Sequence, residues 1–257
     1  HVQQYQHKGE RVWWHQGQDG RTTWRRYGGV TKFLAVLAAL ACLAGATVAA
    51  DPPATWSESF EPYAVGTQLH GQAGWKGWDG DVAWGALVSD ATVHGGGKAV
   101  AIAGDSDLVH EFNATAGCWT FSAWQYVPAD FSGTSYFILL SEYHDGGGYS
   151  WSSQVSFDAG SGRVHSYDDG AELALVRGRW VPIRVEIDLD NDVQRFLYDG
   201  QLLCEKSWTN GVSWGGALAI SALDLYANGA SPIYYDDLAL EPRLSLPPPI
   251  ITPNGGT

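Results

Sequence analysis

Short segments rich in β-branched and aromatic residues recur from residue 51 onward, and this pattern limits the fold more than any other feature. Several of them alternate apolar and polar residues, as a strand with one buried face does. Clusters of Gly, Asp and Asn separate them and favour tight turns, and no window shows a sustained helical period. The segments are 119–128, 135–143, 151–158, 162–168, 180–190 and 193–203. We therefore predict an all-β fold, a two-sheet antiparallel β-sandwich of the jelly-roll type.

The segment 33–50 is apolar, uncharged and rich in alanine, and it ends in small residues after a single preceding lysine. This pattern predicts a secretory signal peptide over 30–50, and hence a secreted or cell-surface protein. The alternative is a membrane-spanning helix, but 18 residues lie near the lower limit for a span. The sequence contains no methionine. We interpret residues 1–29 as an untranslated upstream segment and Val30 as the true start.

The charge balance after residue 50 is strongly acidic. Residues 1–50 hold six of the 15 Lys and Arg and two of the 28 Asp and Glu, so the remainder keeps nine basic and 26 acidic residues. Such a chain repels nucleic acid and anionic membranes, because their phosphates require Lys and Arg for neutralisation. We expect a polysaccharide or glycan as partner, no nucleic acid, and no membrane insertion after signal cleavage.

One domain accounts for 51–242, because this length buries a full core without disulfides. The rest, 243–257, is rich in Pro and then Gly, which is typical of a linker. Cys118 and Cys204 remain after signal cleavage. An oxidising compartment permits them to pair, but they stand 86 positions apart, which leaves open whether they meet.

Three segments carry a resemblance to a known family. Residues 184–203, "RVEIDLDNDVQRFLYDGQLL", form a strand, a turn and a returning strand. With "SFEPYAVGTQLHGQAGW" (59–75) near the start and "SPIYYDDLALEP" (231–242) at the end, the chain resembles the concanavalin A-like lectin/glucanase superfamily and its laminin-G-like bacterial members. The resemblance implies a β-sandwich over 55–242 whose last strand pairs with the first. It leaves activity open, because the superfamily includes lectins, binding modules, hydrolases and lyases.

Candidate catalytic residues are Glu142, His144 and Glu186. The resemblance implies comparison with laminarinases, whose Glu-x-Asp-x-x-Glu strand holds two glutamates about 5 Å apart. Here Glu186 and Asp188 match the first half, but the second glutamate is missing, so a solvated strand before a turn is the favoured interpretation. Glu142 and His144 precede a triple-glycine loop. A lyase would instead use His144, Tyr149 or His165 as base with Gln154 near the uronate carboxylate, but the shortage of Lys and Arg argues against it.

Candidate sugar-binding residues fall into three groups. The segment "GWKGWDGDVAW" (74–84) places indole rings in a glycine-rich loop, where sugars can stack on them; the alternative is that these rings pack on the core. A second group follows the triple-glycine loop, and a third surrounds a late turn. The residues are Trp75, Trp78 and Asp79 in the first group, Trp151 and Gln154 in the second, and Asp224, Tyr226 and Asn228 in the third.

A structural calcium ion is expected from the same resemblance. An acidic residue near the first strand, Glu58 or Glu61, would join one on the last strand, Asp236 or Asp237. Calcium takes six to eight oxygen ligands, which carboxylates and backbone carbonyls supply. The alternative is that Asp236 and Asp237 only cap a strand end.

These observations favour a secreted, lectin-like carbohydrate-binding module. A polysaccharide-degrading enzyme of the same fold, a glycoside hydrolase more than a lyase, is the first alternative. A structural adhesion module that binds protein is the second. The order follows from the abundance of aromatic residues and the lack of a recognisable catalytic pair in the sequence.

Overall fold

The computed structural model describes residues 5–7, 10–12, 55–213 and 215–243. The chain divides into two units, 1–52 and 53–257. In the first, β1 (Tyr5–His7) and β2 (Glu10–Val12) form an antiparallel pair. The expected signal peptide, 30–50, and residues 244–257 of the expected linker lie outside the described residues. In the described part of the chain, no helix has the length and apolar character needed to cross a membrane.

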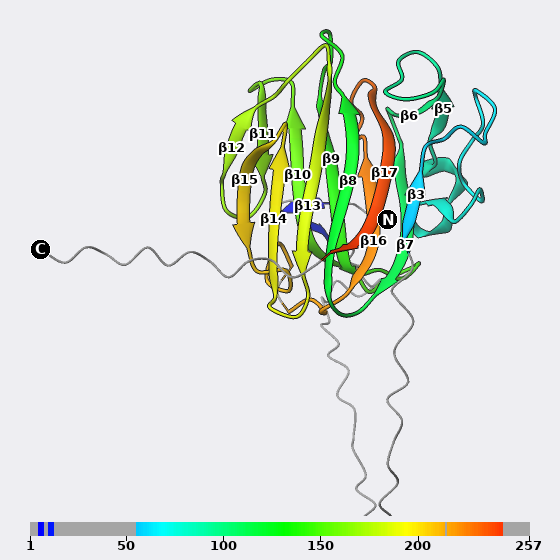
Figure 1. Cartoon of the computed structure of the whole chain (residues 1–257). Helices are drawn as coiled ribbons and strands as arrows, with labels where there is room; N and C mark the ends of the chain where they lie inside the picture. Colours follow the sequence, from blue (N-terminus) through cyan, green and yellow to red (C-terminus); the bar gives the residue numbers. More distant parts are fainter. Residues whose placement is uncertain (1–4, 8–9, 13–54, 214, 244–257) are drawn as a thin grey trace, which may run out of the picture. The chain divides into compact units, whose positions relative to one another are not determined.

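Two antiparallel sheets form the second unit and confirm the predicted β-sandwich (Figure 1). The strand order of the seven-stranded sheet is β12-β11-β10-β9-β16-β7-β4. Its strands are β12 (Glu172–Ala174), β11 (Arg163–Ser166), β10 (Ser150–Asp158), β9 (Thr134–Glu142), β16 (Ile220–Tyr226), β7 (Asp107–Ala114) and β4 (Trp75–Gly77). Two 3₁₀ turns, η1 (Trp78–Gly80) and η2 (Val82–Trp84), follow β4.

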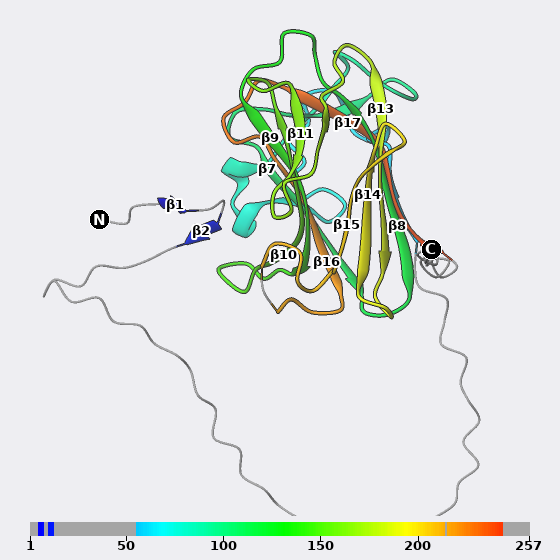
Figure 2. The ribbon, with the colours of Figure 1, turned by 90° about the vertical axis from the view of Figure 1, so that its left-hand side faces the viewer.

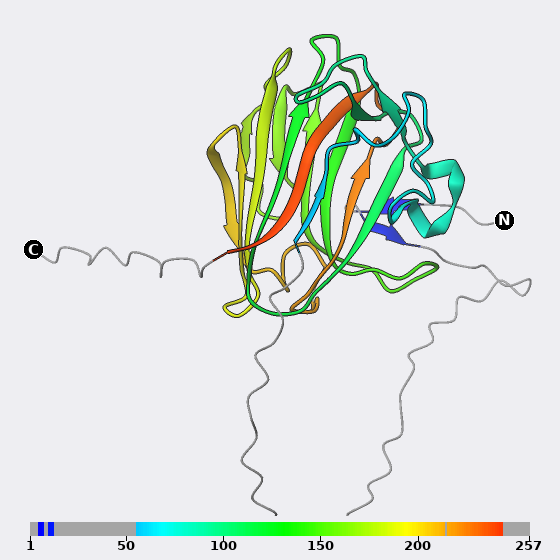
Figure 3. The ribbon, with the colours of Figure 1, turned by 45° about the vertical axis from the view of Figure 1, so that its right-hand side comes forward.

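The eight-stranded sheet has the order β15-β14-β13-β8-β17-β6-β5, with β3 paired to β17. Its strands are β15 (Gln201–Lys206), β14 (Val193–Tyr198), β13 (Trp180–Asp188), β8 (Cys118–Tyr126), β17 (Ile233–Arg243), β6 (Ala99–Ile102), β5 (Leu87–Ser89) and β3 (Trp56–Glu58). Figure 3 shows β17 as the long red strand with β3 beside it. The expected pairing of the last strand with the first is thus confirmed.

The core lies between the sheets and follows the alternation read in the sequence. Along β8, Phe121 and Ala123 are buried while Trp124 and Tyr126 are partly exposed on the outer face. Phe137 of the opposite sheet contacts Phe121 with ring centroids 5.6 Å apart. Burying one such side chain contributes about 2 kcal/mol of stability, so the many apolar core residues stabilise the sandwich without a covalent link.

Cys118 and Cys204 are both buried free thiols. They lie on β8 and β15, which are separated by β13 and β14 in the sheet order. Three strand spacings amount to about 14 Å. Since a disulfide requires Cα atoms within about 7 Å, the two cysteines do not pair in this fold.

Candidate functional site

The segment 74–84 and the loop after β9, two candidates from the sequence, lie against each other. Figure 2 shows both on the outer side of the seven-stranded layer. The Lys76 ammonium donates to both carboxylate oxygens of Asp145, at 2.7 and 2.8 Å. These hydrogen bonds lower the pKa of Asp145, outweighing the opposite effect of its burial. The two segments therefore form one wall beside the sheet face.

Asp79 makes a second set of hydrogen bonds between these two segments. Its backbone takes a left-handed conformation, with φ of 56°, which Asp tolerates better than most residues. One carboxylate oxygen, Oδ1, accepts the Gly146 N–H at 3.1 Å and the Tyr149 hydroxyl. The Asp79 N–H donates to the Tyr143 hydroxyl at 2.9 Å. Asp79 therefore positions the wall and has one carboxylate oxygen already engaged.

Trp78 lies beneath this wall and is only 5% exposed. Its ring is 5.0 Å from that of Tyr143, 4.7 Å from that of Tyr149 and 6.4 Å from that of Trp151, nearly parallel to the last. It also packs on apolar side chains of the outer sheet face, which are Val109, Ile138, Leu140 and Ala222. Trp78 therefore supports Tyr149 and Trp151, which remain partly exposed, rather than offering its own face to a ligand.

The outer face of the seven-stranded sheet continues beyond Trp78 as a set of aromatic and polar side chains. Cross-strand register aligns Tyr226, Tyr136, Ser156 and His165 in one row. The adjacent row contains Asp224, Ile138 and Gln154. Tyr136 and Tyr226 stack with ring centroids 5.8 Å apart. We call the partly exposed set of Tyr136, Trp151, Ser156, His165 and Tyr226, with Gln154 at its floor, the outer aromatic face.

Hydrogen bonds fix part of this face. The Tyr226 hydroxyl donates to Asn228 Oδ1 at 3.0 Å, and Asn228 Nδ2 donates to the Thr134 carbonyl at 3.3 Å. Burial, followed by the nearby Asp158 carboxylate, raises the pKa of Tyr136. Its hydroxyl is therefore a neutral hydrogen-bonding group at physiological pH. Asn228 holds the ring of Tyr226 in place, which is an indirect role in any binding.

Besides Trp78, two further predicted sugar contacts, Trp75 and Asp224, are buried. Trp75 is 1% exposed and lies in the main core, where its indole N–H donates to Glu58 at 3.1 Å. Successive residues of a strand face opposite sides, so Lys76 faces outward while Trp75 faces inward. Asp224 is 0% exposed between the Val109 and Ile138 strands of the sheet. Its carboxylate is buried and cannot contact a surface ligand in this conformation.

The catalytic candidates do not converge. Glu142 and His144 are exposed, with 3.9 Å between Oε1 and Nε2. Glu186 lies on the other sheet, where it pairs with Arg184 at 3.1 Å and Arg243 at 3.0 Å. A retaining pair of carboxylates needs a separation of about 5 Å across one groove. Glu142 and Glu186 lie on different sheets and therefore do not supply the two close carboxylates that a retaining hydrolase needs.

Glu58, one of the residues expected to hold calcium, already accepts hydrogen bonds from protein donors. Glu58 Oε1 accepts the Phe60 N–H at 2.7 Å, and Oε2 accepts the Tyr63 hydroxyl at 2.8 Å as well as the Trp75 indole N–H. A cation would compete with these three donors. Glu58 thus stabilises the core edge by hydrogen bonds within the protein.

Glu61, Asp236 and Asp237 instead hold the glycine-rich loop 94–98. Glu61 Oε1 accepts the N–H groups of Gly97 and Lys98, both at 2.8 Å. Asp236 Oδ2 accepts those of His94 at 2.9 Å and Gly95 at 3.1 Å. Asp237 Oδ2 lies 2.7 Å from His94 Nδ1. These three carboxylates therefore gather at the same loop, and a calcium ion joining Glu58 or Glu61 to Asp236 or Asp237 stays a prediction.

Cys118, Asp188 and Asp190 place ligand atoms within 4.8 Å of one another, as a metal site would. Asp188, however, accepts the Asn191 N–H at 3.0 Å and its side-chain amide at 2.9 Å. Asp190 accepts the Gly117 N–H at 2.9 Å. The cluster caps the turn after β13, and its oxygens are used for that purpose.

All nine Lys and Arg side chains within the described part of 55–243 have a carboxylate or carbonyl partner. Seven form ion pairs, while Lys98 and Arg177 donate to backbone carbonyls. The ion-paired residues are Lys76, Arg163, Arg179, Arg184, Arg195, Lys206 and Arg243. The outer aromatic face contains none of them.

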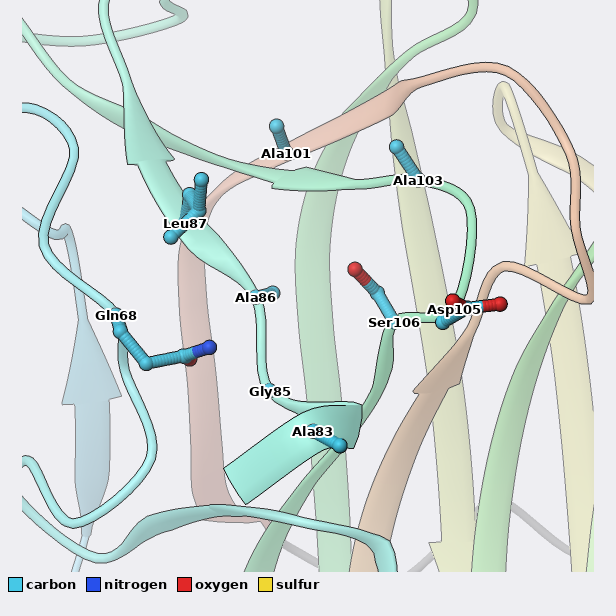
Figure 4. Close-up of a pocket in the computed structure, with 9 residues that line it drawn as sticks. All are labelled: Gln68, Ala83, Gly85, Ala86, Leu87, Ala101, Ala103, Asp105 and Ser106. Atoms are coloured by element: carbon cyan, nitrogen blue, oxygen red, sulfur yellow. The ribbon is translucent and has the colours of Figure 1, made fainter. Parts of the chain in front are cut away.

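A separate pocket of about 310 Å³ lies at the β5–β6 edge of the other sheet (Figure 4). Small residues line much of it, together with Leu87, Gln68, Asp105 and Ser106. In Figure 4 the Ser106 side chain points into this hollow. None of the residues proposed from the sequence lines it.

The sequence missed Tyr136 and Ser156 as members of the outer aromatic face. A usable signal was present in "SYFILLSEY", because Tyr136 shares strand parity with Ile138 and Leu140. Assigning that parity to the outer face required the register with β16, which the sequence alone does not provide.

Comparisons with known proteins agree with the fold. No protein-family model and no curated protein matches the chain. Among solved structures, a sialidase matches 75% of this chain and 19% of its own at 7% identity and a TM-score of 0.51. The alginate lyase Aly36B matches 76% of this chain and 100% of its own at 16% identity and a TM-score of 0.47. Both are carbohydrate-active proteins, and at these identities the likeness to the sialidase shows a shared fold alone.

Proposed function

We propose that the chain is a secreted, lectin-like module of the concanavalin A-like superfamily that binds a neutral polysaccharide or cell-surface glycan. The binding site is the outer aromatic face. The observation that carries this proposal is the placement of Trp151, Tyr136 and Tyr226 beside Gln154 and His165 on adjacent strands of one sheet.

The chemistry of these groups suits a sugar. A pyranose has apolar C–H faces, which stack on aromatic rings, and a rim of hydroxyls, which need donors and acceptors. Trp151 and the stacked pair of Tyr136 and Tyr226 provide rings, and Ser156 and His165 provide partly exposed polar groups beside the buried Gln154. The rings are supported from behind by Trp78 and by Asn228, so little side-chain entropy is lost on binding.

The charge distribution favours a neutral ligand over a polyanion. The Lys and Arg residues of the described domain are engaged with protein acceptors, and those nearest the site, Lys76 and Arg163, pair with carboxylates. A polyanion would have to displace these partners. A neutral glycan requires no such exchange.

A polysaccharide lyase is the second candidate, and one observation favours it. Tyr136 and His165 flank Ser156 in one cross-strand row, next to Gln154. A lyase removes the proton alpha to a uronate carboxylate with a Tyr or His base, while an amide or cation neutralises the carboxylate. The pairing of Arg163 with Glu172, at 4.0 Å, leaves this arrangement without an unengaged cation nearby and places it second.

The experiment is affinity electrophoresis of the full chain in gels cast with neutral and uronate-containing polysaccharides. The same polymers are assayed for new reducing ends and for the ultraviolet absorbance of an unsaturated uronate. Retardation by a neutral polymer without product supports the binding module. An unsaturated product would overturn it in favour of the lyase, and neither signal would favour a protein-binding adhesion module.

A further inference from the structure

The outer face of the eight-stranded sheet carries a second set of aromatic rings that the proposed function does not use. Cross-strand register aligns Trp180 of β13, Tyr126 of β8 and Tyr234 of β17 in one row. Ring centroids are 5.6 Å apart for Tyr126 and Trp180, and 6.5 Å apart for Tyr126 and Tyr234. All three side chains are partly exposed, whereas the neighbouring inward row, which includes Val181 and Tyr235, is fully buried.

The row continues into the pocket of Figure 4. Tyr234 pairs with Ala101 of β6, which pairs with Leu87 of β5, and both line the hollow. The Ala101 side chain is much smaller than those of the three aromatic residues in the same row, and this leaves room for the pocket. Five strands at about 4.8 Å spacing make the row about 19 Å long. That length suits an extended chain rather than one small molecule.

A wall borders the row on one side. His94 stacks on Trp124 with ring centroids 3.9 Å apart and lies 5.7 Å from Trp180 in an edge-on arrangement. The loop that carries His94 is fixed by Asp236 and Asp237. The sandwich therefore uses these two carboxylates to hold the loop that carries His94 beside the row.

We propose that this row is a second glycan-binding surface, so that the domain binds polysaccharide on both outer faces and cross-links chains. The proposal rests on the proposed function for its ligand class. Amphipathic aromatic rings with polar tips suit a hydroxylated, ring-shaped repeat. The neighbouring carboxylates Asp237 and Asp130 disfavour an anionic polymer, and Arg179 is already paired with Asp199 at 2.5 Å.

A second copy of the chain is the competing occupant of this face. Every copy carries the same acidic excess, which opposes self-association at low ionic strength. Burial, followed by Asp130 and Tyr126, raises the pKa of Tyr234. Its hydroxyl is therefore neutral and able to hydrogen-bond a sugar hydroxyl across the physiological range. The acidic charge of every copy therefore favours the glycan over a second copy.

The test compares three variants of the full chain with the wild type in gels containing a soluble β-glucan, a xylan or a galactomannan. The variants are Trp151→Ala, the double variant Trp180→Ala/Tyr234→Ala, and the ring-preserving control Trp180→Phe/Tyr234→Phe. The unfolding midpoint of each variant is first compared with that of the wild type. If the alanine double variant is destabilised, the binding of the ring-preserving double variant is used in its place. Turbidity of protein and polysaccharide mixtures reports cross-linking, and sedimentation reports self-association.

We expect the aromatic row of the alanine double variant to bind polysaccharide about tenfold more weakly, and its mixtures with polysaccharide to stay clear. The Phe double variant should keep most of the binding and most of the turbidity. Retardation and turbidity equal to the wild type in the alanine double variant would overturn the proposal. So would a wild-type dimer that this variant converts to a monomer. Weaker binding in Trp180→Ala/Tyr234→Ala but not in Trp151→Ala would instead overturn the first site and retain this one. A wild-type chain that no gel retards would overturn both.

Discussion

At the scale of single residues, the direction in which a side chain leaves the backbone decides whether a tryptophan packs in the core or on the outer face of the sheet. Trp75 and Trp78 stand three apart in a loop-like segment, and both look equally suited to stacking on a sugar in the sequence. The short strand β4 turns Trp75 into the core, where it contacts Trp56 and Phe60. Trp78 lies on the outer face of the sheet, where its ring packs against that of Trp151. The residue type alone does not distinguish these outcomes.

Replacing Trp75 tests the core assignment. The Trp75→Ala variant should lose about 3–5 kcal/mol of unfolding free energy, because it opens a cavity and removes a hydrogen-bond donor from Glu58. Urea unfolding measures the change. Trp84→Ala, at a site 40% exposed, is the matched control and should lie within about 0.5 kcal/mol of the wild type. Comparable losses in both variants would contradict the assignment.

At the scale of elements, hydrogen bonds from aspartates decide where loops lie. Asp79 joins η1 to the loop after β9, and Asp192 accepts the Thr209 N–H at 2.8 Å and the hydroxyls of Ser207 and Thr209. The sequence predicted turns at such positions from composition. It did not indicate which loops each carboxylate would join, because those contacts span 15 to 70 positions.

The Asp79 contact predicts a local change in dynamics. In Asp79→Ala, hydrogen exchange at the Gly146 amide should accelerate about tenfold, because the acceptor is lost and alanine is strained at positive φ. Asp79→Asn is the control, since it keeps an acceptor oxygen and tolerates this backbone conformation. Unchanged exchange in Asp79→Ala would mean that the loop is held by other contacts.

The turn between β13 and β14 predicts a pH dependence. Burial of Asp188 acts to raise its pKa, but hydrogen bonds from Asn191 and Cys118 outweigh it and hold the pKa below its usual range. The stabilisation is therefore present above the unfolded carboxyl pKa of 3.8 and is lost as pH falls through the depressed folded value. Asp188→Asn should cost about 1 kcal/mol at pH 6, and this difference should shrink toward pH 3. A difference independent of pH, measured by urea unfolding, would contradict this account.

At the scale of the whole molecule, composition and turn spacing were sufficient to predict the β-sandwich, and the family resemblance implied the pairing of the last strand with the first, seen as β3 with β17. Neither could predict which side chains lie next to each other in a cross-strand row of either sheet. Tyr136 and His165 lie in one row although 29 positions separate them, and the row of Trp180, Tyr126 and Tyr234 spans three strands. Rows of this kind depend on sheet order and register, which are set by long-range packing.

The calcium expectation is tested on the whole molecule. Because Glu58, Asp236 and their neighbours accept hydrogen bonds from protein donors, we expect the unfolding temperature with calcium and with chelator to agree within about 1 °C. Differential scanning calorimetry of the full chain measures it. A rise of several degrees with calcium would show that these carboxylates rearrange to bind the ion.

The central claim is that the outer aromatic face binds a neutral glycan, and Trp151 tests it most directly. Isothermal titration of the polysaccharide that retards the wild type should give a dissociation constant about tenfold higher for Trp151→Ala, or ~1.4 kcal/mol. Leu202→Ala, 53% exposed on the other sheet, should bind as the wild type does. Equal affinities for Trp151→Ala and Leu202→Ala, with both variants folded, would contradict the claim.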